Sequence, residues 1–151
     1  MNVREYLQRS PVVVQPDETI ESAARTMARE GVGTLIVADH GRLVGIVTDR
    51  DLVLRALATR TPLDARIDSV MSMDVVAVDA DSDVRDALRA FSRHAVRRLP
   101  VLDGDTIVGL VSVDEMTIVL AEEFGEIVKG LTAQSLFPHA ADLAPVPAKV
   151  G

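Results

Sequence analysis

The fold is decided by a stretch that occurs twice, LIVADHGRLVGIVTDRDL at residues 35–52 and LPVLDGDTIVGLVSVDEM at residues 99–116. A shift of 64 residues extends the match, so that residues 12–52 lie over residues 76–116 without a gap and 13 of the 41 pairs are identical. Repetition of this kind indicates one structural unit that is used twice. We therefore expect function where the two copies meet or where they differ.

Each copy has the pattern of a strand, a helix, two strands and a second helix. Short β-branched runs at 12–14 and 75–78 precede residues with helical spacing, and Thr19 and Asp83 are placed to cap those helices. Two apolar runs follow in each copy, joined by a turn that contains Asp and Gly, which predicts a hairpin. A closing helix is expected over about residues 49–58 and from residue 113 onward.

The sequence thus predicts an α+β fold in which tandem β-α-β-β-α repeats pack about a pseudo-twofold axis and leave two related clefts. We expect the repeats at residues 1–60 and 66–120, a helical extension at 121–134 and a disordered tail, rich in Ala and Pro, at 135–151. The extended helix has an apolar stripe, which either covers its own domain or forms a dimer contact. The stripe consists of Met116, Val119, Leu120, Phe124, Ile127, Val128 and Leu131.

The composition excludes several classes of function. The chain has no cysteine, which rules out disulfides and thiolate zinc sites, and its three histidines lack metal-ligand spacing, so no metal site is expected. The net charge of −7 argues against a nucleic-acid partner. No apolar run reaches the roughly 18 residues of a membrane span, and the polar N-terminus does not resemble a signal peptide. The sequence therefore predicts a soluble, cytoplasmic protein.

The residues that could carry chemistry lie at the start of the first closing helix and before the second hairpin. Thr48 lies at a helix N-terminus, which favours anions such as phosphate, and Asp51 offers an acceptor to a ribose diol. The alternative is that Thr48 and Asp51 form a capping box that serves only the helix end. Arg97 and Arg98 suit phosphate through their planar guanidinium groups, or they are an ordinary surface pair.

This doubled unit, with Gly45-Ile46-Val47-Thr48-Asp49-Arg50-Asp51-Leu52 and Arg97-Arg98-Leu99-Pro100-Val101, resembles a stand-alone cystathionine-β-synthase (CBS) domain pair, or Bateman module, over about residues 3–120. The resemblance implies an adenosine-containing ligand in the clefts: AMP, ADP or ATP, with S-adenosylmethionine or NAD as other possibilities. It brings Thr48, near the phosphate, and Asp51, at the ribose hydroxyls, into one cleft with Arg97 and Arg98. The backbone near Val76 and Val96 would form the adenine slot.

The resemblance also implies a second cleft, which departs from the family pattern. It would use Ser112 and Glu115 against Val12 and Val32, with glutamate in place of aspartate and no arginine pair. Ser112 and Glu115 also fit a capping box, the favoured interpretation of this pair. We therefore expect one competent site and one degenerate site.

Three functions follow, from different classes. The leading interpretation is a regulatory protein that senses adenosine nucleotides, has no catalytic activity of its own and forms a homodimer through its closing helices. The alternative is a structural or interaction module that has lost its ligand and holds a partner through the C-terminal helix. An enzyme is the least favoured, because no nucleophile or metal constellation is recognisable.

Overall fold

The computed structural model describes residues 1–7 and 9–136, with side chains described up to residue 132. The chain divides into two compact units, residues 1–113 and a second unit that begins at Asp114, and each is described by itself. The second unit holds nearly all of helix α4 (Val113–Leu136). This helix reaches two residues into the segment that we expected to be disordered, and residues 137–151 of that segment lie outside the described residues.

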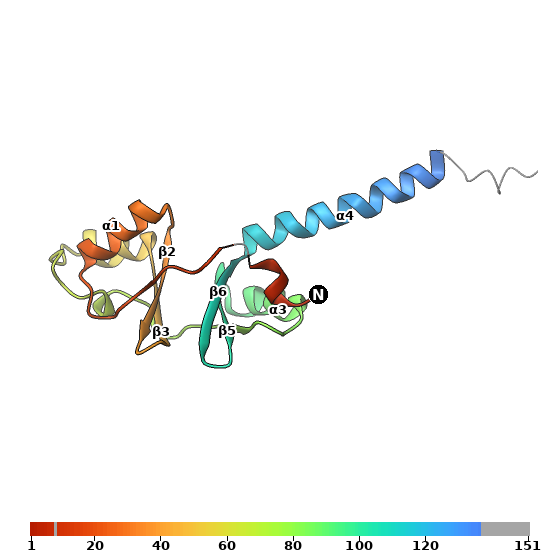
Figure 1. Ribbon diagram of the computed structural model, residues 1–151. Helices are drawn as coiled ribbons and strands as arrows, with labels where there is room; N and C mark the ends of the chain where they lie inside the picture. The colour runs from red at the N-terminus through yellow and green to blue at the C-terminus, as the bar shows by residue number, and fades with distance from the viewer. Residues whose placement is uncertain (8, 137–151) are drawn as a thin grey trace, which may run out of the picture. The chain divides into compact units, whose positions relative to one another are not determined.

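The first unit contains two three-stranded mixed sheets, one from each repeat (Figure 1). In each sheet the first strand runs parallel to the second, and the second pairs antiparallel with the third. This arrangement, together with the long C-terminal helix, confirms the predicted α+β fold. The elements are the 3-10 helix η1 (Val3–Tyr6), β1 (Val13–Val14), α1 (Ile20–Glu30), β2 (Thr34–Asp39), β3 (Arg42–Thr48), α2 (Asp49–Asp51), the π-helix η2 (Leu52–Leu57), the 3-10 helix η3 (Ile67–Ser69), β4 (Val78–Asp79), α3 (Val84–His94), β5 (Arg98–Asp103) and β6 (Thr106–Ser112).

Local sequence signals account for the helix ends and the hairpin turn. The predicted caps are confirmed, because Thr19 accepts a hydrogen bond from Ser22 N–H and Asp83 accepts one from Arg85 N–H. The first hairpin turns through His40 and Gly41, which both have positive φ, as a two-residue type I′ turn requires. Side-chain acceptors therefore lie where the helices begin, and residues with positive φ lie where the chain reverses direction.

Two predicted elements differ in detail from the structure. The strand expected at 75–78 is shorter, because Ser72 forms an isolated bridge with Ile46 of the first repeat and the chain then crosses to the second sheet before β4 begins. The first closing helix is α-helical for three residues only and then π-helical, with Ala58 N–H bonded to Val53 O at 2.9 Å.

The core of each repeat is completed by a short segment from the start of the other repeat. Ile67, which is fully buried, belongs to the core of the first repeat together with Val70 and Met71. In the same way, Val3 N–H donates to Ser82 O at 3.0 Å, so that η1 lies on the second repeat. Because Val3 and Ile67 are 64 residues apart, the repeat extends to these segments. The two repeats are thus joined by crossed segments as well as by contact between β3 and β6.

The glycines at the centre of the third strands explain how the crossed segments fit. A side chain at Gly45 would collide with Met71, and one at Gly109 would collide with Leu7. Both glycines lie where a crossed segment passes close to the strand backbone, so each strand needs a residue without a Cβ atom at this point.

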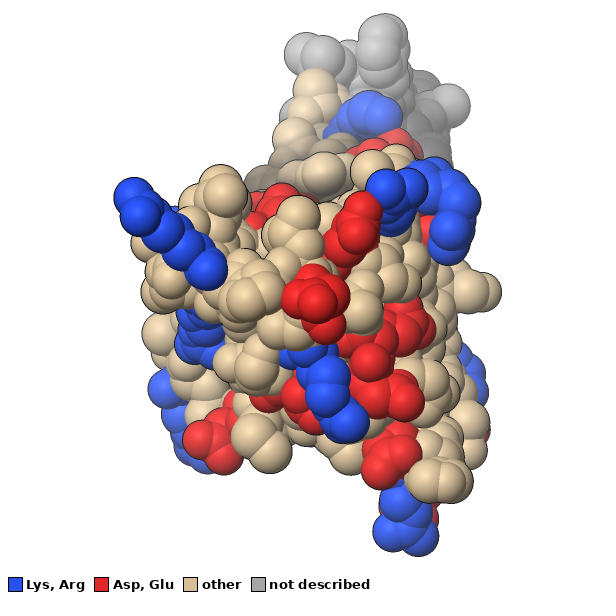
Figure 2. Space-filling model, turned by 90° about the vertical axis from the view of Figure 1, so that its left-hand side faces the viewer, with Lys and Arg blue, Asp and Glu red and all other residues tan. Residues whose placement is uncertain are grey.

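Charged residues of both signs cover the face formed by the first repeat. Figure 2 shows acidic side chains gathered in the middle of this face, with basic side chains around them. Several charged residues of the first repeat and of the segment after it form ion pairs, including Arg25 with Glu21 at 2.7 Å and Arg66 with Asp68 at 2.6 Å. The hydrogen bond to Asp68 raises the pKa of the Arg66 guanidinium. No helix within the described residues has both the length and the apolar character needed to cross a membrane.

Candidate functional site

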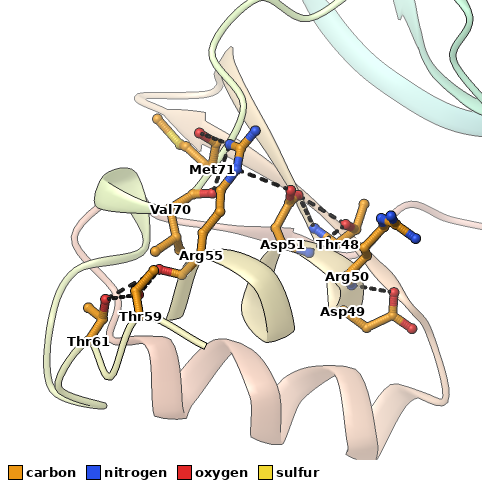
Figure 3. A network of polar contacts seen from close by, with 9 residues as sticks. All are labelled: Thr48, Asp49, Arg50, Asp51, Arg55, Thr59, Thr61, Val70 and Met71. Carbon is orange, nitrogen blue, oxygen red and sulfur yellow. Dashed lines mark hydrogen bonds and ion pairs between the residues drawn. The ribbon is translucent and has the colours of Figure 1, made fainter. Parts of the chain in front are cut away.

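Thr48 and Asp51 lie where β3 ends and the closing helix of the first repeat begins (Figure 3). Asp51 Oδ2 accepts hydrogen bonds from the Thr48 backbone N–H at 2.9 Å and from the Thr48 hydroxyl at 3.0 Å, while Asp51 N–H donates to Thr48 Oγ1 at 3.1 Å. These bonds form the capping box that was the structural alternative for this pair. The box uses only one of the two carboxylate oxygens, and the other, Oδ1, lies 3.8 Å from Arg55 Nε.

A cavity of about 240 Å³ is lined by residues of both repeats. Four of the predicted site residues line it, namely Thr48 from the first repeat and Val96, Arg97 and Arg98 from the second. The remaining lining residues are Ile46, Asp49 and Arg50. Asp51 and Val76 are not among the lining residues, although Asp51 is bonded directly to Thr48. The structure therefore brings together the helix start of one repeat and the arginine pair of the other.

Three guanidinium groups make this cavity electropositive. Arg98 begins β5, and Arg97 directly before it accepts a hydrogen bond from Val113 N–H at its backbone oxygen, 3.0 Å away. Arg50 lies in the first turn after β3, beside Asp49, the only acidic lining residue. Within the described part of the chain, no ion pair involves the guanidinium groups of Arg50 or Arg98. Such a cavity can bind an anion through several charge-assisted hydrogen bonds.

Sequence reasoning did not single out Arg50 as a site residue. The sequence did contain a signal for Arg50. It lies within the motif at residues 45–52, one residue before Asp51 and in the same helix start as Thr48. Helical periodicity gives no information over so short a helix, so only the cavity identifies it.

The two repeats differ at the position of Arg97. A Cβ atom on Gly33 would lie 2.9 Å from Asp49 Oδ2, so the Asp49 side chain would have to shift to admit one. The second repeat has Val113 where the first has Asp49, and it carries Arg97 where the first has Gly33. The second repeat therefore lacks the carboxylate that a side chain at this position would meet in the first repeat.

The residues predicted for the second cleft belong to different units of the chain, so the structure describes them separately. Val12 and Val32 are half-buried and pack against the core of the first repeat. Ser112 ends β6, whereas Glu115 lies on α4 in the second unit. Nearby in sequence, Thr34 is buried and its hydroxyl has no hydrogen-bond partner. The degenerate second site therefore stays a prediction.

Comparison with known proteins identifies the family. The CBS domain model matches residues 3–57 and 67–122, which make up most of the chain. The chain belongs to the CBS domain family. It is similar to the CBS domain-containing protein YhcV of Bacillus subtilis (strain 168), with 31% identity over 117 residues that cover 78% of this chain and 84% of that protein.

Two solved structures of the family contain adenosine compounds. A CBS domain protein from Pyrobaculum aerophilum complexed with AMP is 28% identical to this chain, with a TM-score of 0.70, and the match covers 76% of this chain and 89% of that one. The CBS domain pair of protein MJ0100, in complex with 5′-methylthioadenosine and S-adenosyl-L-methionine, is 25% identical, with a TM-score of 0.73, and the match covers 82% and 98%.

Proposed function

We propose that this CBS pair is a regulatory protein that binds an adenosine nucleotide and has no catalytic activity of its own. The observation that carries the proposal is the cavity in which Thr48 of the first repeat meets Arg97 and Arg98 of the second. In the proposed complex Asp51 accepts hydrogen bonds from the ribose hydroxyls, and the backbone near Val76 and Val96 contacts the adenine. The adenosine compounds in the two related structures support this choice of ligand.

The charge of the cavity favours phosphorylated adenosines. AMP, ADP, ATP and NAD all present phosphate oxygens, which match the planar donors of Arg50, Arg97 and Arg98. S-adenosylmethionine has one carboxylate and no phosphate, and its sulfonium and ammonium groups would meet like charge here. We therefore rank AMP, ADP and ATP above S-adenosylmethionine as ligands of this site.

Binding between the repeats provides a way to regulate. The ligand contacts residues of both halves, so it binds most tightly to the relative arrangement of the halves that satisfies all of these contacts. This arrangement of the halves is therefore more populated in the bound protein than in the free protein. A partner or a second copy of the chain can respond to the change. The degenerate Ser112 and Glu115 cleft leaves one responsive site per chain.

The test is a thermal-shift panel with AMP, ADP, ATP, S-adenosylmethionine and NAD. A ligand at a hundredfold excess over its dissociation constant should stabilise the protein by about 2.7 kcal/mol. Asp51→Asn retains a carbonyl oxygen for the capping box, so it should leave the melting temperature of the free protein nearly unchanged and remove the response to the ligand. Asp51→Ala should also lower the stability of the free protein, by about 1 kcal/mol, because it removes the carboxylate half of the capping box.

The control is Asp105→Ala, which changes an exposed carboxylate in the turn between β5 and β6. This variant should keep the full response. If the wild-type protein responds to none of the five compounds, the proposed function is wrong. If Asp51→Asn responds like the wild type, Asp51 serves the helix end alone.

A second candidate function rests on the exposed apolar residues of α4. Between residues 118 and 131, five large apolar side chains are at least 42% exposed, which is unusual for a monomeric helix. We propose a homodimer contact here, or a partner-binding surface if the chain has lost its ligand. Light scattering at micromolar concentration separates the two, because a monomer contradicts the dimer. The residues are Ile118, Phe124, Ile127, Val128 and Leu131.

A further inference from the structure

Arg55 joins the candidate ribose-binding carboxylate to the segment that connects the two repeats (Figure 3). Its Nη1 atom donates to the backbone oxygens of Val70 and Met71 at 3.3 and 3.4 Å. Its Nε atom lies 3.8 Å from Asp51 Oδ1, the oxygen that the capping box leaves unused. The Asp51 side chain is only 16% exposed, so solvent screens this ion pair less than a surface pair.

The backbone of Arg55 is itself fixed. Its carbonyl oxygen accepts hydrogen bonds from the hydroxyls of Thr59 and Thr61, at 2.7 and 3.2 Å, and these two hydroxyls lie 2.8 Å apart. Arg55 lies in the last turn of η2, where carbonyl oxygens lack donors within the helix, and the threonine side chains satisfy this one. Arg55 is therefore held at its backbone while its side chain reaches in two directions.

The segment that Arg55 contacts leads to the proposed adenine slot. Val70 and Met71 are buried in the core of the first repeat, and Ser72 exchanges two backbone hydrogen bonds with Ile46, at 2.9 and 3.0 Å. Four residues later the chain reaches Val76. Ile46 lines the cavity between the repeats, so the segment that Arg55 contacts is hydrogen-bonded to a lining residue of the candidate site.

The second repeat cannot form an equivalent connection from the corresponding residue. A shift of 64 residues places Val119 at the position of Arg55, and valine has neither a charge nor a donor in its side chain. The connection is thus specific to the repeat that carries Thr48 and Asp51.

We propose that Arg55 is a positioning residue for nucleotide binding. It holds the Asp51 carboxylate so that Oδ1 faces the ribose diol, and it transmits occupancy of that carboxylate to the backbone at residues 70–72. This inference rests on the proposed function, because it needs an adenosine nucleotide at Asp51.

The test compares AMP with 2′-deoxy-AMP on the full chain by calorimetry. Arg55→Met removes the ion pair with Asp51 and both hydrogen bonds to the backbone oxygens, and it keeps much of the aliphatic side chain. Arg55→Lys restores a charge without the planar fork. We expect Arg55→Met to weaken AMP binding about tenfold, which corresponds to about 1.4 kcal/mol. We expect a smaller loss for 2′-deoxy-AMP, because this ligand keeps only one of the two hydroxyls that the oriented carboxylate recognises. Arg55→Lys should lie between Arg55→Met and the wild type.

A matched control is Arg25→Met, which breaks an ion pair of the same spacing with Glu21 on α1 and should leave both affinities unchanged. Hydrogen exchange provides a second readout: AMP should slow exchange of the Ser72 amide in the wild type and not in Arg55→Met. An equal loss of affinity for the two ligands would show that Arg55 only maintains the fold, and would overturn the inference while the proposed function stands. A wild-type chain that does not bind AMP would overturn both.

Discussion

Replacing Ile67 by alanine tests whether the crossed segments hold the two repeats together. Ile67 lies at the start of the second repeat in sequence, yet it is fully buried in the core of the first. The substitution removes three carbon atoms, worth about 2.4 kcal/mol in transfer free energy at about 0.8 kcal/mol per carbon. The cavity left behind adds to this, so we expect a total loss of about 2–5 kcal/mol of unfolding free energy.

Urea denaturation followed by circular dichroism measures this loss. For a chain of this length the same change lowers the melting temperature by roughly 5 to 15 °C. Leu63→Ala is the matched control, because Leu63 lies on the same connection but is 57% exposed, and we expect it to change stability by less than about 0.5 kcal/mol. If Ile67→Ala costs less than about 1 kcal/mol, the segment is not part of the first core and the crossed arrangement is wrong.

Four further results are expected. Val3→Ala, at the equivalent position on the second repeat, should cost about 2 kcal/mol in the same urea assay, because it removes one carbon fewer than Ile67→Ala. Gly109→Ala should cost about 1–3 kcal/mol by urea denaturation, since its Cβ meets the Leu7 side chain. Calorimetry should find one nucleotide per chain, and two equal sites would contradict the degenerate second cleft. Phe124→Glu should shift a dimer toward monomer in light scattering, and an unchanged mass would exclude α4 as the contact.

Much of the fold could be predicted because the signals were local and occurred twice. Thr19 and Asp83 cap helices through bonds within three residues, and the turn at His40 and Gly41 depends on adjacent backbone angles. The crossed segments could not be predicted, because Val3 and Ile67 contact residues of the other repeat, and no local pattern reports such pairing. The π-helical winding of η2 was also missed, since its six residues are too few for apolar spacing to distinguish it from an α-helix.

In the candidate site, too, local features could be predicted from the sequence and long-range contacts could not. Thr48 was found from its position at a helix start, and the arginine pair from the divergence of the two copies. Their meeting in one cavity depends on the packing of the repeats, which only the family resemblance had implied. Arg50 and Arg55 were missed because their importance lies in what they face: a cavity in one case and two carbonyl groups of a distant segment in the other.

A crystal structure of the chain grown with AMP tests the central proposal most directly. We expect one AMP per chain between the repeats, with its ribose hydroxyls within about 2.5–3.2 Å of Asp51 Oδ1. Its phosphate should contact Arg97 or Arg98. AMP bound away from Asp51 and both arginines, or a cavity without AMP at saturating concentration, would contradict the account.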